Sequence, residues 1–446
     1  MNKKLVVLLL TVSIGVVFLL GCSNHSIDQT ILAEKRFGEE HELEKMKDLD
    51  GQDKEEVKNE EPAEEPAKED EKIKIPKLEI DTYEIPDNEA MRLVTDMRVG
   101  WNLGNTLDAA FDNPNFSDEL MYESSWCGVK TTKEMIKEIK ESGFHSIRIP
   151  VSWHNHITDD NFTISEPWMD RVQEVVDYAV EQDLYIILNI HHDITKDYYY
   201  PSKEFEENSS KYMASIWKQI GNRFGEYNEK LIFEAVNEPR LVGTNNEWWL
   251  EMNKEDCRES VEIINGLNQV FVNTVRSTGK NNTSRYLMVP GYSASPENVL
   301  IDEFTIPTDL KENDNKIILS VHAYTPYNFA LQAPNESGSI TNFDATSLNS
   351  KKDINFFMDR LYEKYISKGI PVIIGEFGAR DKQNNLQDRV DFAAYYTAYA
   401  RARGMTCFWW DNNAFVGNGE NFGLLDRRTV TWKYPEILEA LIKYSM

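Results

Sequence analysis

Eight short apolar segments alternate with helix-like segments through most of this 446-residue chain. The strand-like segments are 97–103, 146–151, 184–190, 231–236, 286–289, 317–321, 371–375 and 406–410. The helix-like segments are 131–142, which Thr131 can cap, and 168–182, 205–224, 261–277, 353–367, 389–403 and 435–444. This order predicts parallel strands covered by helices. Eight units favour a (β/α)8 TIM barrel over residues 81–446, although length and period alone leave a doubly wound sheet open.

Polar or aromatic side chains lie at the C-terminal tip of each predicted strand. They are Asn102 and Asn105, Arg148, His191, His192 and Asp193, Asn237 and Glu238, Tyr292, His322 and Tyr324, Glu376, and Trp409, Trp410 and Asp411. In an open sheet these groups would be spread along one edge, whereas a closed barrel directs them into one crevice. Their common position therefore favours the barrel and places the predicted site at that end of it.

The stretch 231–240, LIFEAVNEPR, is predicted to be a buried strand that delivers a carboxylate. Pro239 cannot donate to a sheet, so we expect the strand to stop before it and Glu238 to project from its tip. By itself, Asn-Glu-Pro fits a simple turn equally well. Glu376, at the end of another predicted strand, supplies a second carboxylate. Hydrolysis of a glycosidic bond with retention needs two such groups about 5–5.5 Å apart, one protonated and one ionised.

Other strand-tip residues suit the support of such a pair. Arg148 can lower the pKa of the nucleophile through its charge and donate hydrogen bonds to it. Tyr324 can orient the same carboxylate, and Asn237 can bond the 2-hydroxyl of the sugar. We expect His322 to lie beside the acid and to tune it.

Seven ordered motifs resemble glycoside hydrolase family 5, the cellulase-type retaining glycosidases of clan A. They are GWNLGNT (100–106), RIPVSW (148–153), NIHHD (189–193), NEP (237–239), HAY (322–324), GEFG (375–378) and WWDN (409–412). The set also resembles subfamily 4, in which endo-β-1,4-glucanase, xyloglucanase and lichenase activities are common. The resemblance implies a TIM-barrel enzyme whose chemistry needs no metal and no other cofactor.

By this resemblance Glu238 is the acid/base and Glu376 is the nucleophile. The remaining active-site positions of the family are filled by Arg148, His191, Asn237, His322, Tyr324 and Trp409. We expect His192 and Asn105, which also lie at strand tips, to support the substrate.

Aromatic side chains in the predicted loops suit polysaccharide binding, because flat rings stack on the apolar faces of pyranose units. The candidates are Trp126, Trp153, Trp248, Trp249, Trp409 and Tyr327. About half of such rings are expected to pack in the core instead. Trp409 and then Trp153 are the foremost sugar platforms, whereas Trp101 is expected in the core.

The predicted activity is that of a retaining endo-β-1,4-glucanase on β-1,4-glucans, with xyloglucan and mixed-linkage β-glucan as further substrates. A mannanase or xylanase on the same scaffold stays open, because specificity resides in loops. A non-catalytic, glycan-binding surface lipoprotein is a third hypothesis, and the intact glutamate pair weighs against it. A metal hydrolase built on His191, His192 and Asp193 would require activity to be lost on chelation, and the chain lacks the H-E-x-x-H pattern there.

Residues 1–21 are predicted to be a lipoprotein signal peptide. Lys3 and Lys4 precede an uncharged, mostly apolar run at 5–20, which is short for a membrane span. The sequence LLGC at 19–22 resembles a bacterial lipobox, whose cysteine is lipidated. We therefore expect Cys22 to anchor the protein to the outer face of a bacterial membrane. The alternative is an ordinary signal peptide with an incidental Cys22, which would give a secreted enzyme.

Residues 22–80 are predicted to be a disordered acidic linker. Segment 38–72 contains 16 acidic and 6 basic residues, and it repeats Glu-Glu-Pro-Ala. Such a segment cannot bury enough apolar surface to fold, and its charges extend it into a spacer. The net charge of the whole chain, −27, argues against nucleic acid or an anionic membrane surface as a partner. The expected partner is a β-glucan, and we expect a monomer.

Three cysteines follow the linker, namely Cys127, Cys257 and Cys407. They form no CxxC pair and no close Cys/His cluster, so structural zinc is not expected. We expect mostly buried thiols, with one disulfide left open.

Overall fold

The computed structural model describes residues 72–446 apart from 113–114, 314, 383–384 and 418. The predicted signal peptide, Cys22 and the linker up to residue 71 lie outside the described residues. Within the described part, no helix combines the length and the apolar character that crossing a membrane requires.

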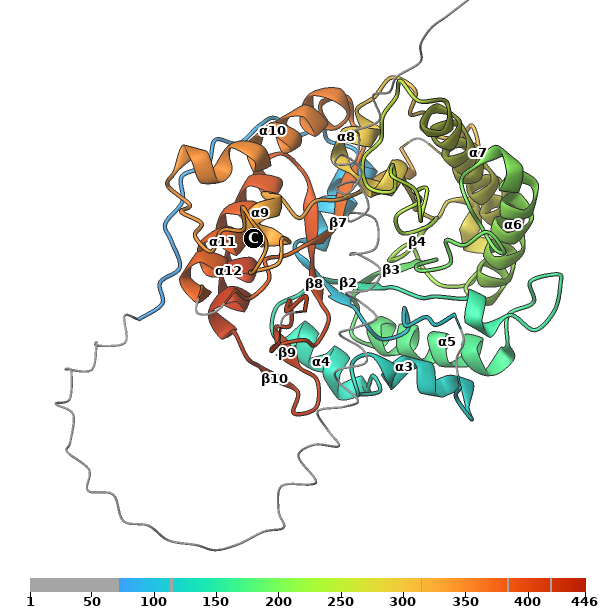
Figure 1. Cartoon of the computed structure of the whole chain (residues 1–446), viewed down its shortest axis with the longest axis horizontal. Helices are drawn as coiled ribbons and strands as arrows, with labels where there is room; N and C mark the ends of the chain where they lie inside the picture. Colours follow the sequence, from blue (N-terminus) through green and yellow to red (C-terminus); the bar gives the residue numbers. More distant parts are fainter. Residues whose placement is uncertain (1–71, 113–114, 314, 383–384, 418) are drawn as a thin grey trace, which may run out of the picture. The chain divides into compact units, whose positions relative to one another are not determined.

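The eight predicted strands form a closed parallel barrel (Figure 1). They are β1 (Gly100–Leu103), β2 (Ser146–Ile149), β3 (Tyr185–Asn189), β4 (Leu231–Glu234), β5 (Leu287–Pro290), β6 (Ile317–His322), β7 (Val372–Phe377) and β8 (Thr406–Asp411). β8 pairs with β1, so the sheet has no free edge. The prediction of a TIM barrel is confirmed, and the doubly wound alternative is wrong.

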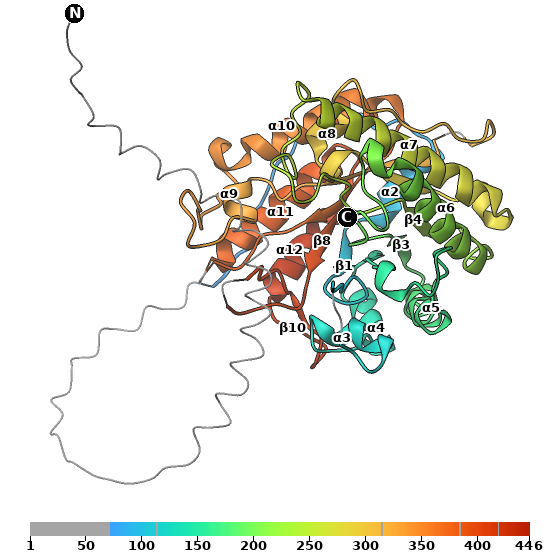
Figure 2. The same cartoon turned by 45° about the vertical axis from the view of Figure 1, so that its right-hand side comes forward.

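Helices surround the barrel, as Figures 1 and 2 show. The long ones are α4 (Lys133–Glu141), α5 (Glu166–Glu181), α6 (Glu206–Arg223), α7 (Glu255–Ser277), α10 (Leu348–Lys364), α11 (Leu386–Ala402) and α12 (Pro435–Ser445), and all were predicted. The unpredicted elements include α2 (Glu89–Met97), α3 (Tyr122–Ser125), α8 (Pro296–Val299), α9 (Tyr327–Ala330), β9 (Leu425–Asp426) and β10 (Thr431–Trp432).

The cap of α4 is Thr132 and not the predicted Thr131. The hydroxyl of Thr132 accepts from the backbone N–H of Met135 at 3.3 Å. The backbone N–H of Thr131 instead donates to the buried carboxylate of Glu123 at 2.7 Å. The prediction was wrong by one residue because either threonine of the pair can start a helix, and this tertiary contact selects the second.

Two apolar layers lie on opposite faces of the strands. The inner layer contains Ile187, Ile232, Met288, Ile318, Ile373 and Phe408, and α2 adds Leu93, Val94 and Met97 to it. The outer layer joins the strands to the surrounding helices and contains Trp101, Ile147, Leu188, Phe233 and Trp409. Because side chains alternate across a strand, one position separates the barrel interior from the helix layer. With apolar residues filling one part of the interior, the polar strand tips occupy the other end.

Residues 72–80 pack on the barrel and do not continue the predicted linker. Ile73, Ile75, Leu78 and Ile80 contact the outer layer. The backbone of Lys74 exchanges two hydrogen bonds with the side-chain amide of Gln387 on α11, at 2.8 and 2.7 Å. The predicted start of the folded domain at residue 81 was therefore late, because the acidic composition of the preceding segment masks this short apolar run.

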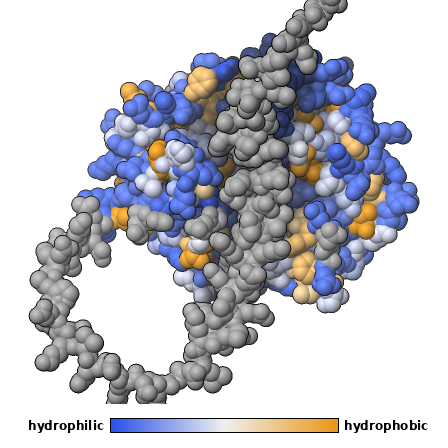
Figure 3. All heavy atoms as spheres, in the orientation of Figure 1, coloured by the Kyte–Doolittle hydropathy of each residue, from blue (hydrophilic) through white to orange (hydrophobic). Residues whose placement is uncertain are grey.

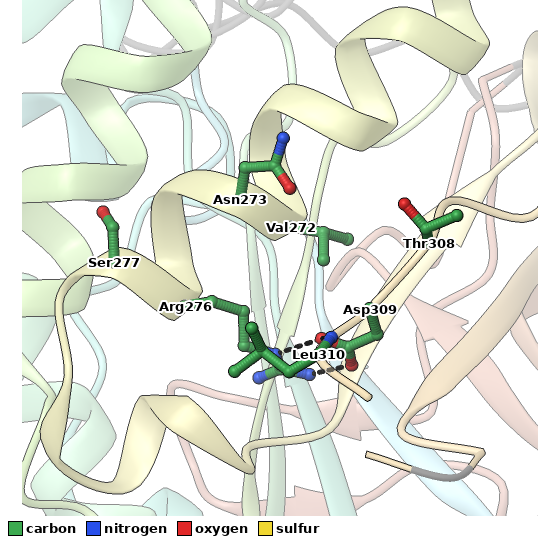
Figure 4. Close-up of a pocket in the computed structure, with 7 residues that line it drawn as sticks. All are labelled: Val272, Asn273, Arg276, Ser277, Thr308, Asp309 and Leu310. Atoms are coloured by element: carbon green, nitrogen blue, oxygen red, sulfur yellow. Dashed lines mark hydrogen bonds and ion pairs between the residues drawn. The ribbon is translucent and has the colours of Figure 1, made fainter. Parts of the chain in front are cut away.

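The connection between β5 and β6 is fixed to α7 by an ion pair. Nε and Nη2 of Arg276 donate to the two carboxylate oxygens of Asp309 at 2.7 and 2.6 Å. Both residues line a pocket of about 340 Å³ beside α7, and Figure 4 shows the contacts between them as dashed lines. The face of the molecule in Figure 3 is mainly hydrophilic, with scattered hydrophobic residues.

The three cysteines of the folded part are buried, free thiols. They are Cys127, Cys257 and Cys407. The prediction of buried thiols is confirmed, and the disulfide that the sequence left open does not form among these three.

Candidate active site

Arg148 lies at the centre of the polar end of the barrel. It comes from β2, is fully buried, and points inward. Its Nε donates to Glu234 at 2.7 Å, and Nη1 donates to Glu376 at 2.7 Å. Nη1 also donates to Oδ1 of Asn102 at 3.0 Å, and Nη2 donates to Oδ1 of Asn237 at 2.8 Å. One guanidinium thus orders side chains from β1, β4 and β7.

Glu376 is placed by β7 and held by two donors. Nη1 of Arg148 reaches Oε1, and the hydroxyl of Tyr324 donates to Oε2 at 2.9 Å. Burial, with the charge of Glu376 next in order, raises the pKa of Tyr324 well above its usual value, so the phenol stays a donor. With one donor on each oxygen, the carboxylate has a fixed orientation. This arrangement matches the one predicted for the nucleophile.

Glu238 lies four residues beyond the end of β4, at Glu234, rather than at the strand tip. Its Oε1 lies 2.9 Å from Nδ1 of His322, on β6, as predicted for the acid and its neighbour. Burial alone would raise the pKa of Glu238. The hydrogen bond and charge of His322, with the charge of Arg240, outweigh burial and hold this pKa below its usual range.

His322 lies among three carboxylates. Burial opposes its charged form, but the charge of Glu376, the nearby carboxylate of Glu234 and the hydrogen bond with Glu238 raise the pKa of His322 to about 9. Nε2 faces Glu234 at 3.9 Å, and Nδ1 lies 3.7 Å from Glu376. The imidazole is therefore charged at neutral pH.

The two proposed catalytic carboxylates lie close to one another. One oxygen of Glu238, one of Glu376 and a ring nitrogen of His322 are all within 4.8 Å of each other. An inverting enzyme needs room for a water molecule between its base and the sugar, and a gap this short leaves none. The spacing is that of a retaining glycosidase.

Glu234 is an unpredicted member of the site. It is fully buried and accepts from Arg148, from Nδ2 of Asn189 at 3.0 Å and from the hydroxyl of Ser320 at 2.6 Å. Burial would raise its pKa, but Arg148 first and His322 next lower the pKa to about 2. The sequence feature that could have identified Glu234 is that it is the only charged residue in the apolar run LIFEAV, since a fully buried carboxylate needs a partner.

His191 has a defined tautomer. Nδ1 lies 3.1 Å from Nδ2 of Asn189, which can only donate, so Nδ1 accepts and Nε2 carries the hydrogen. Burial, together with the neighbouring charges of His192 and Arg148, holds the pKa of His191 well below its usual value. The imidazole is thus neutral and can donate from Nε2 to a bound sugar. His192, beside it, is more than one-third exposed.

The three residues of the metal-hydrolase alternative, His191, His192 and Asp193, do not form a cluster of potential ligands. Oδ1 of Asp193 accepts from the backbone of Trp153 and His154 at 2.8 and 2.7 Å, so Asp193 is structural. Asp108 instead lies with His191 and His192, with potential ligand atoms within 4.8 Å. The carboxylate of Asp108 already accepts from two backbone N–H groups, and Nε2 of His191 holds a hydrogen. This cluster therefore does not fit a resident metal ion.

Trp409 is not the sugar platform that the sequence predicted. In the barrel register Trp409 pairs with Trp101, and Trp410 pairs with Asn102. Asn102 points inward to Arg148, so Trp410 points inward as well, while Trp409 faces the helix layer. The indole N–H of Trp409 donates to the carbonyl of Phe422 at 3.0 Å, and the ring is fully buried.

The inward ring of Trp410 lies beside His191. The two ring planes differ by 3°, and their centroids are 5.7 Å apart. Trp410 is thus the aromatic residue of β8 that borders the site. The sequence could not separate the two tryptophans, because adjacent positions differ only in the face they occupy.

The other predicted binding residues divide between core and surface. Trp153 was a predicted platform, but it is fully buried and its indole N–H donates to the carbonyl of Asn189 at 2.9 Å. Trp101 is buried, as predicted. Asn105 has a left-handed backbone, with φ 56°, and its half-buried side chain stays a predicted contact. Of the predicted sugar-binding rings, Trp248, Trp249 and Tyr327 are exposed.

The geometry of the site is that of one class of enzyme. A TIM barrel with a carboxylate pair at the C-terminal ends of its strands, spaced for direct attack, is the arrangement of a retaining glycosidase. Residues 109–416 match the family model described as cellulase (glycosyl hydrolase family 5). The chain belongs to this family and is a glycoside hydrolase.

Three comparisons show how near its relatives are. Endoglucanase 1 of Ruminococcus albus is 42% identical over 358 residues, which cover 80% of this chain and 81% of that protein. The solved structure of a family 5 lichenase from Caldicellulosiruptor sp. F32 is 64% identical, with a TM-score of 0.84, and the match covers 84% of this chain and 100% of that one. Cellulase/esterase CelE of Acetivibrio thermocellus is 39% identical, but the chain spans only 40% of its length.

Proposed function

We propose that this chain is a retaining endo-β-1,4-glucanase, with Glu376 as nucleophile and Glu238 as acid/base. The observation that supports this proposal most directly is that one oxygen of Glu238 and one oxygen of Glu376 lie within 4.8 Å of each other. The identity to endoglucanases and to a lichenase supports β-1,4-glucans, including mixed-linkage β-glucan, as substrates.

In the first step Glu376 attacks the anomeric carbon and forms a covalent bond to it. Arg148 and Tyr324 hold its oxygens in place, so the attack needs no rotation of the carboxylate. The bond to the leaving oxygen breaks with its electron pair, and that oxygen takes a proton from Glu238. The leaving sugar then departs as an alcohol.

The proton for this step is stored on the pair formed by His322 and Glu238. The charge of Glu376 is the main interaction that raises the pKa of His322 to about 9. As Glu376 forms its bond to the anomeric carbon, its negative charge is lost and the pKa of His322 falls. In the same step the proton passes from the pair through Glu238 to the leaving oxygen, where negative charge is developing.

In the second step water attacks the anomeric carbon from the side that the leaving sugar has vacated. Glu238 and His322 take the proton of this water, and the bond to Glu376 breaks with its electron pair on the carboxylate. Two inversions give net retention. The Nδ2 of Asn237 is suited to bond the 2-hydroxyl of the sugar, since Oδ1 is already held by Arg148.

Hydrolysis of a panel of polysaccharides tests the proposal. Purified enzyme should release reducing ends from mixed-linkage β-glucan and carboxymethylcellulose, and also from xyloglucan, with the β-anomer as the first product in NMR spectra. Activity confined to mannan or xylan would support the alternative on the same scaffold. If no polysaccharide is hydrolysed while β-glucan is bound, the protein is a glycan-binding lipoprotein instead.

The location at the cell surface is also a proposal. Its support is the basic start of the chain, the apolar run at 5–20 and the Gly21-Cys22 step, followed by the acidic segment 38–72. In a bacterial host, the native chain should fractionate with membranes and face outward. The Cys22→Ala variant should be recovered in the soluble fraction. Equal partition of the two proteins would contradict the anchor.

A further inference from the structure

Three potential metal ligands meet at one point of the proposed active site. One oxygen of Glu238, one of Glu376 and a ring nitrogen of His322 lie within 4.8 Å of each other. Nδ1 of His322 is 2.9 Å from Oε1 of Glu238 and 3.7 Å from Oε1 of Glu376. His322 and Glu376 lie within β6 and β7, so the barrel holds two of the three ligands in place.

These separations are close to those between the ligands of a tetrahedral zinc ion. Zn²⁺ binds imidazole nitrogen and carboxylate oxygen at about 2.0–2.2 Å, so two ligand atoms of one tetrahedron are about 3.3–3.5 Å apart. The distances of 2.9 and 3.7 Å from Nδ1 of His322 lie on either side of this value. Shifts of about 0.5 Å or less would bring both carboxylates into the coordination sphere. Glu238 lies beyond the end of its strand, so its side chain can make most of this adjustment.

The ligand types favour a transition metal over the common hard cations. An imidazole with two carboxylates suits Zn²⁺, whereas Mg²⁺ and Ca²⁺ require six or more oxygen ligands. Three protein ligands leave the fourth position of the tetrahedron open for a water molecule, as in many zinc sites of enzymes. The ligand set therefore fits Zn²⁺ and does not fit Mg²⁺ or Ca²⁺.

The other ring nitrogen of His322 faces a buried carboxylate. Nε2 lies 3.9 Å from Oε1 of Glu234, which is itself held by the hydroxyl of Ser320. A histidine that binds a metal usually directs its second ring nitrogen toward a carboxylate or carbonyl, which fixes the ring and makes it a better ligand. Nη2 of Arg148 lies 3.5 Å from the same Nε2, and its positive charge opposes a cation here. We therefore expect a moderate affinity.

A zinc ion and a proton compete for Nδ1 of His322. The imidazole is charged at neutral pH, and the groups that face it are the carboxylates of Glu234, Glu238 and Glu376 and the guanidinium of Arg148. When zinc binds, the N–H bond breaks, its proton goes to the solvent, and the lone pair left on Nδ1 binds the metal. The affinity for zinc therefore rises with pH.

We propose that Glu238, His322 and Glu376 form a binding site for Zn²⁺, at which the metal reversibly inhibits the enzyme. The ion occupies the space between the two carboxylates that the anomeric carbon needs, and it engages the nucleophile and the proton donor together. The inhibition rests on the proposed glycosidase function, whereas the binding of the metal does not.

Steady-state kinetics of the native enzyme test the inhibition. About 100 µM Zn²⁺ at about pH 7.5 should lower kcat/KM on mixed-linkage β-glucan at least about tenfold, through KM and not kcat, because zinc and the glucan exclude each other. EDTA should restore the activity. Between about pH 6 and 8 the inhibition constant should fall about tenfold per pH unit, since one proton leaves for each zinc ion bound. Mg²⁺ at the same concentration should have no effect.

Calorimetry measures zinc binding without reference to activity. Glu238→Gln removes one ligand and should weaken the affinity at least about tenfold. The matched control is His192→Asn, which removes one potential ligand from the other cluster, that of Asp108, His191 and His192. This control should bind zinc as the native enzyme does. A loss of affinity in His192→Asn but not in Glu238→Gln would place the metal at the other cluster and overturn the inference.

Co²⁺ tests the site in the native enzyme, so this result does not depend on the folding of a variant. The visible absorption of four-coordinate Co²⁺ should appear, and a non-hydrolysable, thio-linked cellotetraose should abolish it by displacing the metal. A thiolate charge-transfer band would instead place the metal on a cysteine, such as Cys127, Cys257 or Cys407, which are free thiols. Such a band, or a spectrum that the oligosaccharide does not change, would overturn the inference.

The possible outcomes separate this inference from the proposed function. If the native enzyme hydrolyses no β-glucan but binds zinc through Glu238, the proposed function and the inhibition fail, and the metal site stands. If the native enzyme hydrolyses β-glucan but zinc neither binds nor inhibits, the inference alone is wrong. If zinc lowers kcat and leaves KM unchanged, the metal does not occupy the position of the sugar, and the inference is again wrong.

Discussion

Nδ1 of His322 lies 2.9 Å from Oε1 of Glu238, and this contact joins an imidazole of raised pKa to a carboxylate of lowered pKa. The pair titrates as a unit, so its proton belongs to both residues. A glutamate that is ionised in the resting enzyme can still act as a proton donor under this arrangement, because its partner supplies the proton when Glu376 loses its charge.

The first prediction concerns stability against pH. Folding raises the pKa of His322 from 6.5 to about 9, so its contribution to stability is full below pH 6.5 and is lost as the pH rises through 9. The difference in the free energy of unfolding between the native protein and His322→Asn should therefore decrease by roughly 3 kcal/mol as the pH rises from 6.5 to 9. Urea unfolding at several pH values measures this difference. His145→Asn is the control: burial lowers the pKa of His145, so the difference in unfolding free energy between this variant and the native protein should not change with pH above 6.5.

Glu376→Ala should lower kcat on β-glucan at least about 10⁴-fold, because no other carboxylate can attack the anomeric carbon. The melting temperature should change little. Added azide should restore cleavage of 2,4-dinitrophenyl cellobioside and give the α-glycosyl azide, since azide then attacks the anomeric carbon directly from the vacated side and displaces dinitrophenolate. Formation of the β-azide would contradict the assignment of Glu376 as nucleophile.

Glu238→Ala should show a loss that depends on the leaving group. On cellohexaose, which needs protonation, kcat should fall about 10²–10⁴-fold. On 2,4-dinitrophenyl cellobioside formation of the glycosyl-enzyme should be nearly unaffected, so that this intermediate accumulates. Azide should release it as the β-glycosyl azide. Equal losses on both substrates would remove Glu238 from the role of proton donor.

Glu234→Gln should destabilise the fold by about 3–5 kcal/mol, because it leaves the buried guanidinium of Arg148 without one of its two carboxylate partners. It should also lower kcat, since Arg148 loses the contact that directs Nη1 to Glu376. Chemical denaturation measures the first effect. Glu174→Gln is the matched control, because the ion pair of Glu174 with Arg171 is half exposed at the glutamate and worth about 0–1 kcal/mol.

The two tryptophans of β8 should respond differently to substitution. Trp410→Ala should lower kcat/KM on every β-glucan, because it removes the ring beside His191 that borders the attacked sugar. Trp409→Phe should lower the melting temperature but leave kcat/KM within about twofold, because this ring packs outside the barrel. Kinetics and thermal melting of both variants show which ring faces the active site. A loss of activity in Trp409→Phe with no loss in Trp410→Ala would contradict the assignment made from the strand register.

The barrel and the two proposed catalytic glutamates could be predicted from the sequence. Strand-length apolar runs define the eight strands, and the polar residue after each run has to lie at the same end of a parallel barrel. The sequence alone therefore predicts that Glu238 and Glu376 lie close together. Only their separation and their donors required the structure.

Other features depended on information that a sequence does not contain. Trp409 and Trp410 differ by one position, so only the register with β1 shows which ring enters the barrel. Glu234 lies inside its strand, and its part in the site is visible only from its hydrogen bond with Arg148. Arg240 follows Glu238 by two residues, but its stacking on Trp248 depends on how the loop folds back.

The segment 72–80 has a mechanical consequence for a protein held at its N-terminus. A pull on residue 72 meets first the two bonds between Lys74 and Gln387, and then the hydroxyl of Tyr444, which bonds the backbone of Pro76 and Leu78. Both partners are on outer helices, α11 and α12. Tension on the N-terminal segment would therefore act first on these outer helices, before it reached the strands that set the distance between Glu238 and Glu376.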